Sequence, residues 1–294
     1  MEIKYINRAT GKIKIEHPPA EGLINFLYNN SFGEKLILPI AKQKFITQLY
    51  GKMMESSSSI NRIQSFIDAA NIDMSQFKKD VSAFKSFNDF FYRELKEGAR
   101  KIEEGLVSPG DGRILAFEKI SEVNSFYVKG REFTLTEFLK DNELVDKYKD
   151  ASMVILRLAP EDYHRYHFPF KGIPSKSKEI KGTYYSVSPI GLRDNFTKVF
   201  CENKKETCEL KTENKGDILI IPVGATMVGS LNSTYQPNTV VEKGDEMGYF
   251  AFGGSTIVLL FDSTYFKIDE DLLQNTKNDL ETYVKMGEKI GQVI

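Results

Sequence analysis

The stretch Gly253-Gly254-Ser255-Thr256-Ile257-Val258-Leu259-Leu260-Phe261 is the most informative part of this chain. Its last six residues are apolar or β-branched without a break, which predicts a buried strand. Ser255 would then stand at the start of a rigid element, directly after two glycines. Glycine adopts backbone conformations that cost other residues energy, so the peptide before Ser255 can bend toward the serine hydroxyl. The pattern suits a chain that attacks its own backbone, although Gly-Gly-Ser alone is also an ordinary turn.

The composition describes a globular chain that can bury a large core. The chain has 294 residues, of which 41% are hydrophobic and 28% charged, and its net charge is −1. This balance gives no basic field for nucleic acid, so we expect no nucleic-acid partner. Cys201 and Cys208 are seven residues apart, which fits neither a zinc ribbon nor a disulfide framework and indicates a reducing compartment. We expect no signal peptide and no membrane span, so contact with a bilayer would be peripheral.

The pattern of the chain changes near residue 95. A strand pair with a turn at residues 9–11 is expected at 1–16, followed by helical periodicity over 20–91. From residue 101 onward, short strands with glycine turns are expected at 112–120, 152–158, 217–231 and 255–261, with one helix at 134–141. We therefore predict an α+β fold, with a mainly helical region at 1–95 and a β-rich, sandwich-like or barrel-like catalytic core at 96–294.

Two apolar stripes and one capping serine are predicted in the helical region. Ser59 is expected to cap a helix whose apolar face consists of Ile60, Ile63, Ile67 and Ala70. The stripes, flanked by lysines, either pack on the core or lie in a membrane interface. Their residues are Leu23, Ile24, Phe26 and Leu27, and then Leu36, Ile37, Leu38, Ile40 and Ala41.

Two of the three histidines, His164 and His167, lie within Tyr163-His164-Arg165-Tyr166-His167. In a helical turn both imidazoles would share a face, whereas in a strand they would point to opposite sides. Histidine is suited to proton transfer near neutral pH. A zinc site is the alternative, but the spacing of three and the lack of an obvious further ligand argue against it, so we predict no metal.

Asp111 lies between two glycines in SPGDGRI at 108–114. It is suited to a turn, and a carboxylate at a turn can also orient an imidazole and stabilise its cation. Serine, histidine and aspartate together permit either a hydrolase or a self-processing chain. The strand after Ser255 argues against a hydrolase elbow, in which the serine precedes a helix.

The ordered motifs resemble those of the phosphatidylserine decarboxylase proenzymes. They are SPGDGRI at 108–114, YHRYHFP at 163–169 and FGGST at 252–256, with supporting segments FNDFFYRELK at 87–96, VKGREFTL at 128–135, VGATMVG at 223–229 and KGDEMG at 243–248. The likeness covers residues 80–262. Two positions depart from many relatives: Gly253 replaces a leucine, and Lys205 stands where an arginine is usual, which leaves its role open.

The resemblance implies an enzyme whose pyruvoyl cofactor is derived from Ser255. Asp111 would orient His167, which takes the proton of Ser255, and the chain would cleave between Gly254 and Ser255. The pyruvoyl group would form a Schiff base with phosphatidylserine and release CO2 to give phosphatidylethanolamine. His164 would protonate the product.

The same resemblance implies the partners and the location. The two cleavage products would remain together as a heterodimer, with a homo-oligomer also possible. The enzyme would bind phosphatidylserine peripherally at the cytoplasmic face of a bacterial-type membrane. Three alternatives are a pyruvoyl-dependent decarboxylase of a small soluble amino acid, a zinc hydrolase using His164 and His167, and a non-catalytic lipoyl-like or adaptor module.

Overall fold

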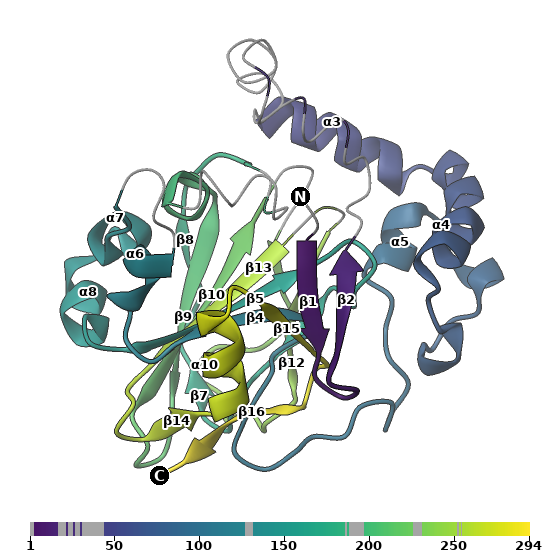
Figure 1. The fold of residues 1–294 in the computed structure, drawn as a ribbon. Helices are drawn as coiled ribbons and strands as arrows, with labels where there is room; N and C mark the ends of the chain where they lie inside the picture. The colour runs from purple at the N-terminus through teal and green to yellow at the C-terminus, as the bar shows by residue number, and fades with distance from the viewer. Residues whose placement is uncertain are drawn as a thin grey trace.

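The computed structural model describes residues 3–16, 44–126, 132–185, 197–225, 231–251 and 255–294, with 22, 26, 30, 187 and 253 (Figure 1). The side chains of 44–48, 125 and 126 are not described. The described strands form one large sheet and two small ones. The large sheet has the order β2-β1-β15-β4-β5-β13-β10-β9-β7, with β8 paired to β9. Its strands are β1 (Ile3–Asn7), β2 (Lys12–Glu16), β4 (Gly112–Phe117), β5 (Ser152–Leu158), β7 (Ile173–Pro174), β8 (Lys178–Ile180), β9 (Lys205–Lys211), β10 (Asp217–Gly224), β13 (Ser255–Phe261) and β15 (Glu281–Val284).

Strand β13 lies at the centre of the large sheet, as its unbroken apolar sequence predicts. All seven of its residues are buried, and it pairs antiparallel with β10 on one side and β5 on the other. Burial on both faces explains why this strand shows no polar alternation. Ser255 is its first residue, so the expected strand after the serine is confirmed.

The first strand pair joins the same sheet. Strands β1 and β2 form the expected hairpin, and β1 pairs parallel with β15 near the other end of the chain. The α+β class is confirmed, but the large sheet is open rather than barrel-like, because in the described part of the chain β2 and β7 stand at separate edges. The proposed boundary between 1–95 and 96–294 remains a prediction.

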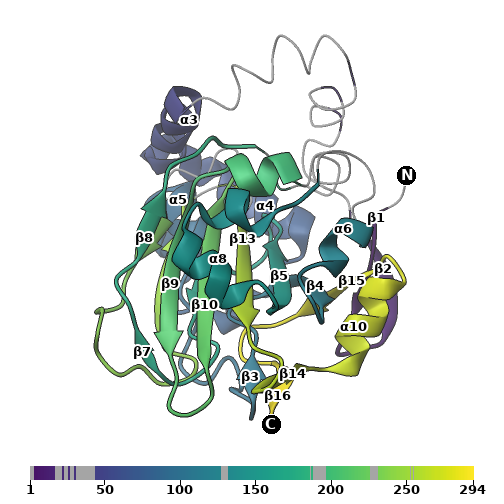
Figure 2. The same cartoon turned by 90° about the vertical axis from the view of Figure 1, so that its left-hand side faces the viewer.

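Helices lie on both sides of the large sheet. Figure 2 shows α6 (Glu122–Phe126), α7 (Leu135–Leu139) and α8 (Asn142–Tyr148) over one face, with α4 (Ile63–Ala70) and α5 (Phe87–Phe91) behind. Helix α10 (Glu270–Lys277) packs beside β4, where the Thr276 hydroxyl accepts a hydrogen bond from the Ala116 amide at 2.9 Å. The expected helix near 134 is α7, whose N-cap Thr134 accepts a hydrogen bond from the amide of Glu137.

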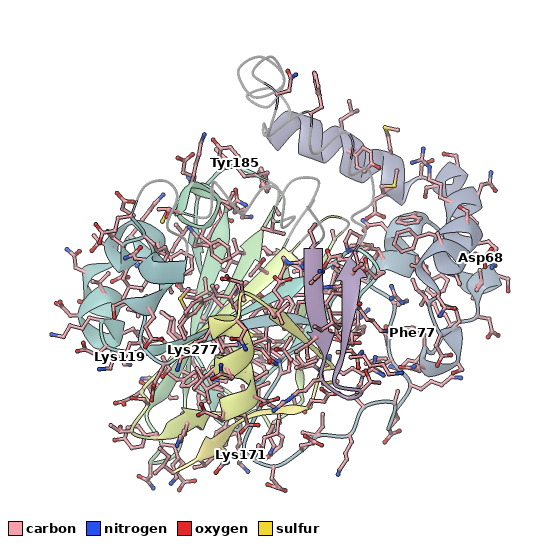
Figure 3. All side chains as sticks on the ribbon, in the orientation of Figure 1. Asp68, Phe77, Lys119, Lys171, Tyr185 and Lys277 are labelled. Atoms are coloured by element: carbon pink, nitrogen blue, oxygen red, sulfur yellow. The ribbon has the colours of Figure 1, made fainter. Side chains whose placement is uncertain are left out.

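The helical region has its own aromatic core. Helix α3 (Lys44–Glu55) packs on α5 and on the 3-10 turn η2 (Ser57–Arg62), and two further 3-10 turns follow, η3 (Met74–Gln76) and η4 (Val81–Ala83). Their shared core consists of Met54, Ile63, Ile67, Phe84, Phe87, Phe90 and Phe91. Phe77, labelled in Figure 3, lies apart from that core and contacts the Tyr163 ring, with 6.4 Å between centroids.

The structure differs from the sequence-based expectation at Ser59. Ser59 does not cap a helix: it lies inside η2, where its buried hydroxyl donates to the Met54 carbonyl and accepts from the Phe87 amide, so it ties α5 to η2. The apolar stripes at 23–27 and 36–41 lie outside the described residues, apart from Phe26, which is exposed. Among the helices that the structure describes, none has the length and apolar character needed to span a bilayer.

Two small sheets complete the fold. One consists of β11 (Leu231–Ser233), β12 (Glu246–Phe250) and β6 (Arg165–His167), and the other of β14 (Phe266–Ile268), β16 (Lys289–Val293) and β3 (Leu106–Val107). Strand β6 carries the histidine motif, and β12 leads toward Ser255. The Phe250 amide donates to the His164 carbonyl at 2.9 Å, so the two segments run together.

Candidate active site

The Ser255 hydroxyl is buried without a hydrogen-bond partner. Ser255 has no exposed surface, and its Oγ contacts no acceptor or donor in the described structure. In the sheet, Ser255 stands between Gly224 of β10 and Leu158 of β5. Gly253, two residues before it, has a φ of 140°, a conformation that favours glycine. The hydroxyl that the sequence predicts to react is therefore buried without a partner, two residues after a glycine in a conformation that other residues rarely adopt.

His164 is buried beside this segment as a neutral imidazole. Its Nδ1–H donates to the Asp162 carbonyl at 2.9 Å, and its Nε2 has no partner in the described structure. The Phe91 ring packs against it with 3.8 Å between centroids. Burial lowers the pKa of His164 to about 3, and the hydrogen bond to the Asp162 carbonyl opposes this shift only in part. The free Nε2 is therefore unprotonated at neutral pH.

His167 lies on β6 in a different environment. Its Nδ1–H donates to the Gly244 carbonyl at 2.8 Å, so Nε2 accepts from the Tyr163 hydroxyl at 3.0 Å. Burial also lowers the pKa of His167. Strand β6 spans Arg165–His167, so His164 lies just before it. The two histidines are not in a helical turn, and their Nδ1–H groups donate to different carbonyls, those of Asp162 and Gly244.

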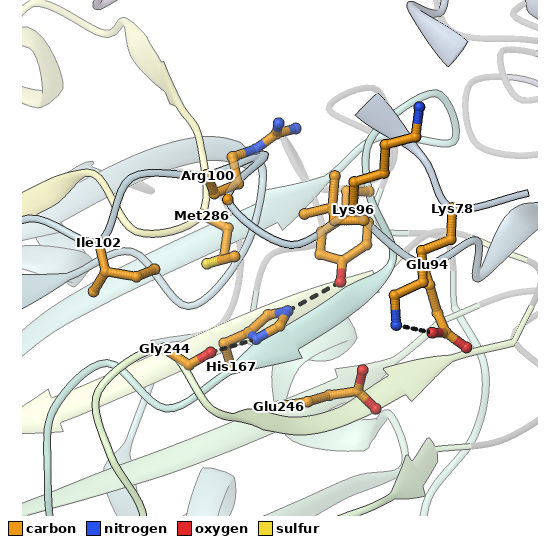
Figure 4. Close-up of a pocket in the computed structure, with 12 residues that line it drawn as sticks. Lys78, Glu94, Lys96, Arg100, Ile102, His167, Gly244, Glu246 and Met286 are labelled. Carbon is orange, nitrogen blue, oxygen red and sulfur yellow. Dashed lines mark hydrogen bonds and ion pairs between the residues drawn. The ribbon is translucent and has the colours of Figure 1, made fainter. Parts of the chain in front are cut away.

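The His167 imidazole faces a polar pocket of about 270 Å³ (Figure 4). Charged side chains of both signs line it: Lys78, Glu94, Lys96, Arg100 and Glu246. Glu94 pairs with Lys78 at 2.6 Å. Part of the charge around the imidazole is therefore already neutralised.

Asp111 lies beside this pocket but does not hydrogen-bond to His167. Its buried carboxylate pairs with Arg100 at 2.6 Å and accepts from the Met286 amide at 2.8 Å. Both ring nitrogens of His167 are bonded elsewhere, so the connection runs through the backbone: the His167 amide donates to the Pro109 carbonyl at 2.8 Å. An arginine within reach is the stronger partner for a buried carboxylate.

The register of the large sheet places Asp111 and Ser255 at the same end. Ser255 pairs with Leu158, and Arg157 pairs with Arg113, so Leu158 stands beside the residue that follows Asp111. With neighbouring strands about 4.8 Å apart, the backbones near Asp111 and Ser255 are roughly 10 Å apart. All four predicted residues thus gather at one end of the sheet, without direct side-chain bonds among them.

A buried ionic cluster supports this end of the sheet. Asp162 pairs with Arg113 at 2.7 Å, and Arg113 and Arg157 both pair with Glu16 at 2.7 Å. Glu161 and Glu281 complete the cluster, at 2.8 Å from Arg113 and 2.5 Å from Arg157. These residues could not be recognised from the sequence because charged side chains are normally expected to face solvent.

Arg100 contacts Asp111 and Tyr163 contacts His167, while Arg93 donates to the Asp162 carbonyl that His164 also contacts. Arg93 and Tyr163 both lie inside motifs that the sequence analysis quoted, which was the available signal. Among the described residues, no group of three or more histidine, cysteine or acidic side chains is arranged to hold a metal ion.

Comparisons with known proteins agree with the motifs. The family described as "Phosphatidylserine decarboxylase" matches residues 87–292 of the chain. A phosphatidylserine decarboxylase proenzyme from Fusobacterium nucleatum is 51% identical over 99% of this chain and 97% of the relative. Proenzymes of the same name from Clostridium botulinum and Clostridium beijerinckii are 44% and 45% identical, each over 98% of both chains.

Proposed function

The chain belongs to the phosphatidylserine decarboxylase family, and we propose that it decarboxylates phosphatidylserine with a pyruvoyl group made from its own Ser255. The product is phosphatidylethanolamine, and the enzyme is a carboxy-lyase. One observation supports the self-processing step: the hydroxyl of Ser255 is buried and unpartnered at the start of the central strand. Because nothing else in the described structure holds this hydroxyl, it is available to attack the preceding carbonyl.

The processing step uses atoms of the chain and one water. The Ser255 Oγ attacks the Gly254 carbonyl carbon, its proton passes to a base, and the Gly254–Ser255 amide becomes an ester. Loss of the Ser255 α-proton expels the Gly254 carboxylate and leaves a dehydroalanine, which water converts to a pyruvoyl group with release of ammonia. Strand β13 is paired on both sides, so residues 255–294 would stay bound to 1–254 after cleavage.

We assign the activation of Ser255 to His167 and Asp111. Both lie at the end of the sheet where Ser255 stands, and the His167 amide is bonded to the turn that carries Asp111. Because Tyr163 occupies the Nε2 atom of His167, that imidazole has to exchange the tyrosine hydroxyl for the serine hydroxyl before it can act as the base. Apo geometry is often looser than the reacting geometry, so this exchange is compatible with the role.

We assign the proton transfers of decarboxylation to His164. When present, the pyruvoyl carbonyl supplies an electrophile that draws electrons from the substrate carbon as CO2 leaves. The substrate ammonium has to lose a proton before its nitrogen can react. We propose that the bare Nε2 of His164 carries this proton between the substrate nitrogen and the product carbon. Burial around His164 also excludes water from the reacting carbon.

We further propose peripheral binding to the cytoplasmic face of a bacterial-type membrane. A diacyl substrate stays in its bilayer, so the active site has to reach the lipid surface. Helix α3 exposes Leu49 and Met53, which are one helical turn apart, with Lys52 beside them. Apolar side chains with a nearby lysine suit an interface that contains anionic lipid.

The decisive experiment is intact mass with denaturing electrophoresis of the purified protein. Two chains, 1–254 and 255–294, are expected, the smaller with a carbonyl that borohydride reduces. Ser255→Ala should remain one chain. Asp111→Asn and His167→Ala should accumulate precursor, whereas His164→Ala should cleave but release no CO2. Equal cleavage in all three variants would remove the assignment of Asp111 and His167, and an active enzyme with an unbroken chain would refute the proposal.

A further inference from the structure

The backbone carbonyl of Asp162 is shared between His164 and a buried arginine. The His164 Nδ1–H donates to this oxygen at 2.9 Å, and Nη2 of Arg93 donates to it at 3.2 Å. The same Nη2 donates to the Glu161 carbonyl at 2.9 Å. Arg93 therefore holds two successive carbonyls of the turn that presents an acceptor to the imidazole.

Arg93 occupies an environment that is costly for a cation. The residue is 2% exposed, and its guanidinium lies over the rings of Phe77 and Phe90, at 4.5 and 4.9 Å from their centroids. In the described structure its hydrogen-bond acceptors are backbone carbonyls, none of them a carboxylate. Burial lowers its pKa to about 10. A buried cation that pairs only with carbonyls fits a role in holding backbone better than a role in charge pairing.

The Asp162 side chain also stabilises this turn, through contacts that do not involve Arg93. Its carboxylate accepts from the Ala159 amide at 2.7 Å and pairs with Arg113 at 2.7 Å. The turn is thereby fixed through both the side chain and the backbone of one residue. On the other side of the imidazole, the Phe91 ring restricts its tilt.

We propose that Arg93 is a positioning residue for His164: by holding the Asp162 carbonyl, it keeps the imidazole in the Nδ1–H tautomer with Nε2 unprotonated. The alternative tautomer would place a lone pair against the carbonyl oxygen and leave a proton on Nε2. That form could not accept the substrate's proton. The catalytic consequence rests on the proposed role of His164 in decarboxylation, but the tautomer can be measured without it.

The test is nitrogen NMR of the imidazoles, which is practical because the chain has three histidines. Arg93→Met keeps an apolar side chain between the two phenylalanine rings but removes the donors. We expect the paired Nδ1–H and bare Nε2 signals of His164 to change to a mixed-tautomer pattern. With the loss of a charged donor, kcat should fall about tenfold or more while KM changes little. Arg93→Lys can still donate to one carbonyl. Compared with Arg93→Met, it should therefore restore part of the His164 nitrogen pattern and part of kcat.

Arg165→Met is the matched control. Arg165 is adjacent to His164 in sequence, and its Nε donates to a backbone carbonyl, that of Tyr92, at 2.9 Å. It does not touch Asp162 in the described structure, so the His164 signals should remain as in the unmodified protein. If Arg93→Met leaves the His164 pattern unchanged, the positioning role is wrong, whatever happens to stability. A changed pattern with full decarboxylation would instead refute the role proposed for His164.

Discussion

Replacing Leu49 and Met53 together by alanine should weaken binding to phosphatidylserine-containing liposomes by roughly 30-fold, at 1.4 kcal/mol per tenfold. The two side chains leave 50% and 48% of their surface exposed on α3. Full burial of such a side chain contributes about 2 kcal/mol, so covering the exposed half contributes about 1 kcal/mol each. The two together give about 2 kcal/mol. This sum sets the expected change in the partition coefficient.

The measurement is sedimentation with liposomes over a range of lipid concentrations, together with intact mass to show that self-cleavage is unchanged. A control pair exists at the opposite end of the molecule, near β7, which lies at the bottom of Figure 1 whereas α3 lies at the top. There Ile173 and Val240 are 41% and 57% exposed. The double alanine variant of this pair removes a comparable apolar area and should bind as the unmodified protein does.

The two variants distinguish binding through a specific docking face from non-specific binding through exposed apolar surface. Equal losses in both would mean that exposed apolar area matters irrespective of its place, and α3 would not be the docking face. Unchanged binding of the α3 variant would exclude Leu49 and Met53 from the interface. Binding should also weaken in high salt, because Lys52 beside them attracts anionic lipid and salt screens that attraction.

Three further predictions concern residues around the sheet. Burial lowers the pKa of Lys205 to about 7, below its unfolded value of about 10.4, so the free energy of unfolding should rise with pH between these values. Lys205→Met should abolish that rise in denaturant titrations at several pH values. Gly112→Ala would place a Cβ 2.5 Å from a backbone carbonyl oxygen of β5 and should cost about 2 kcal/mol in thermal unfolding. Gly110→Ala would place its Cβ 3.4 Å or more from its neighbours, an ordinary contact distance, and should leave the thermal stability unchanged. Asn203→Ala would remove three side-chain hydrogen bonds to the buried backbone of Tyr185 and Gly224. Because Gly224 stands opposite Ser255, this change should slow self-cleavage in a time course of precursor loss.

The local sequence pattern predicted where strands form better than it predicted which strands pair with each other. The apolar runs at 152–158 and 255–261 became strands with those bounds, because a buried strand needs only its own side chains to be recognised. The parallel pairing of β1 with β15 could not be predicted, since it joins segments more than 260 residues apart. Pairing at that distance depends on the packing of the whole sheet.

The candidate site shows the same division. Motif and residue type predicted Ser255, His164, His167 and Asp111 as the groups that would carry chemistry, and the structure places them at one end of the sheet. Their hydrogen-bond partners were not predictable, because these come from other segments of the chain. Asp111 pairs with Arg100, and the Nδ1–H of His167 donates to the Gly244 carbonyl. The sequence left a helical turn and a strand both open for the two histidines, and the structure has a short strand, β6, that contains His167 and begins just after His164.

The helical region and His164 are joined by continuous packing, which gives lipid binding a physical route to the chemistry. Helix α3, which carries the proposed docking residues, contacts α5, and the Asn88 side chain of α5 donates to Glu55 at the end of α3. Phe91 ends α5, and its ring packs on His164. A shift of α3 on a bilayer would therefore press on the imidazole through one short helix. If that coupling operates, liposomes should change the His164 nitrogen signals in the unmodified protein but not in Phe91→Ala. Identical responses in both would mean that docking only concentrates the substrate.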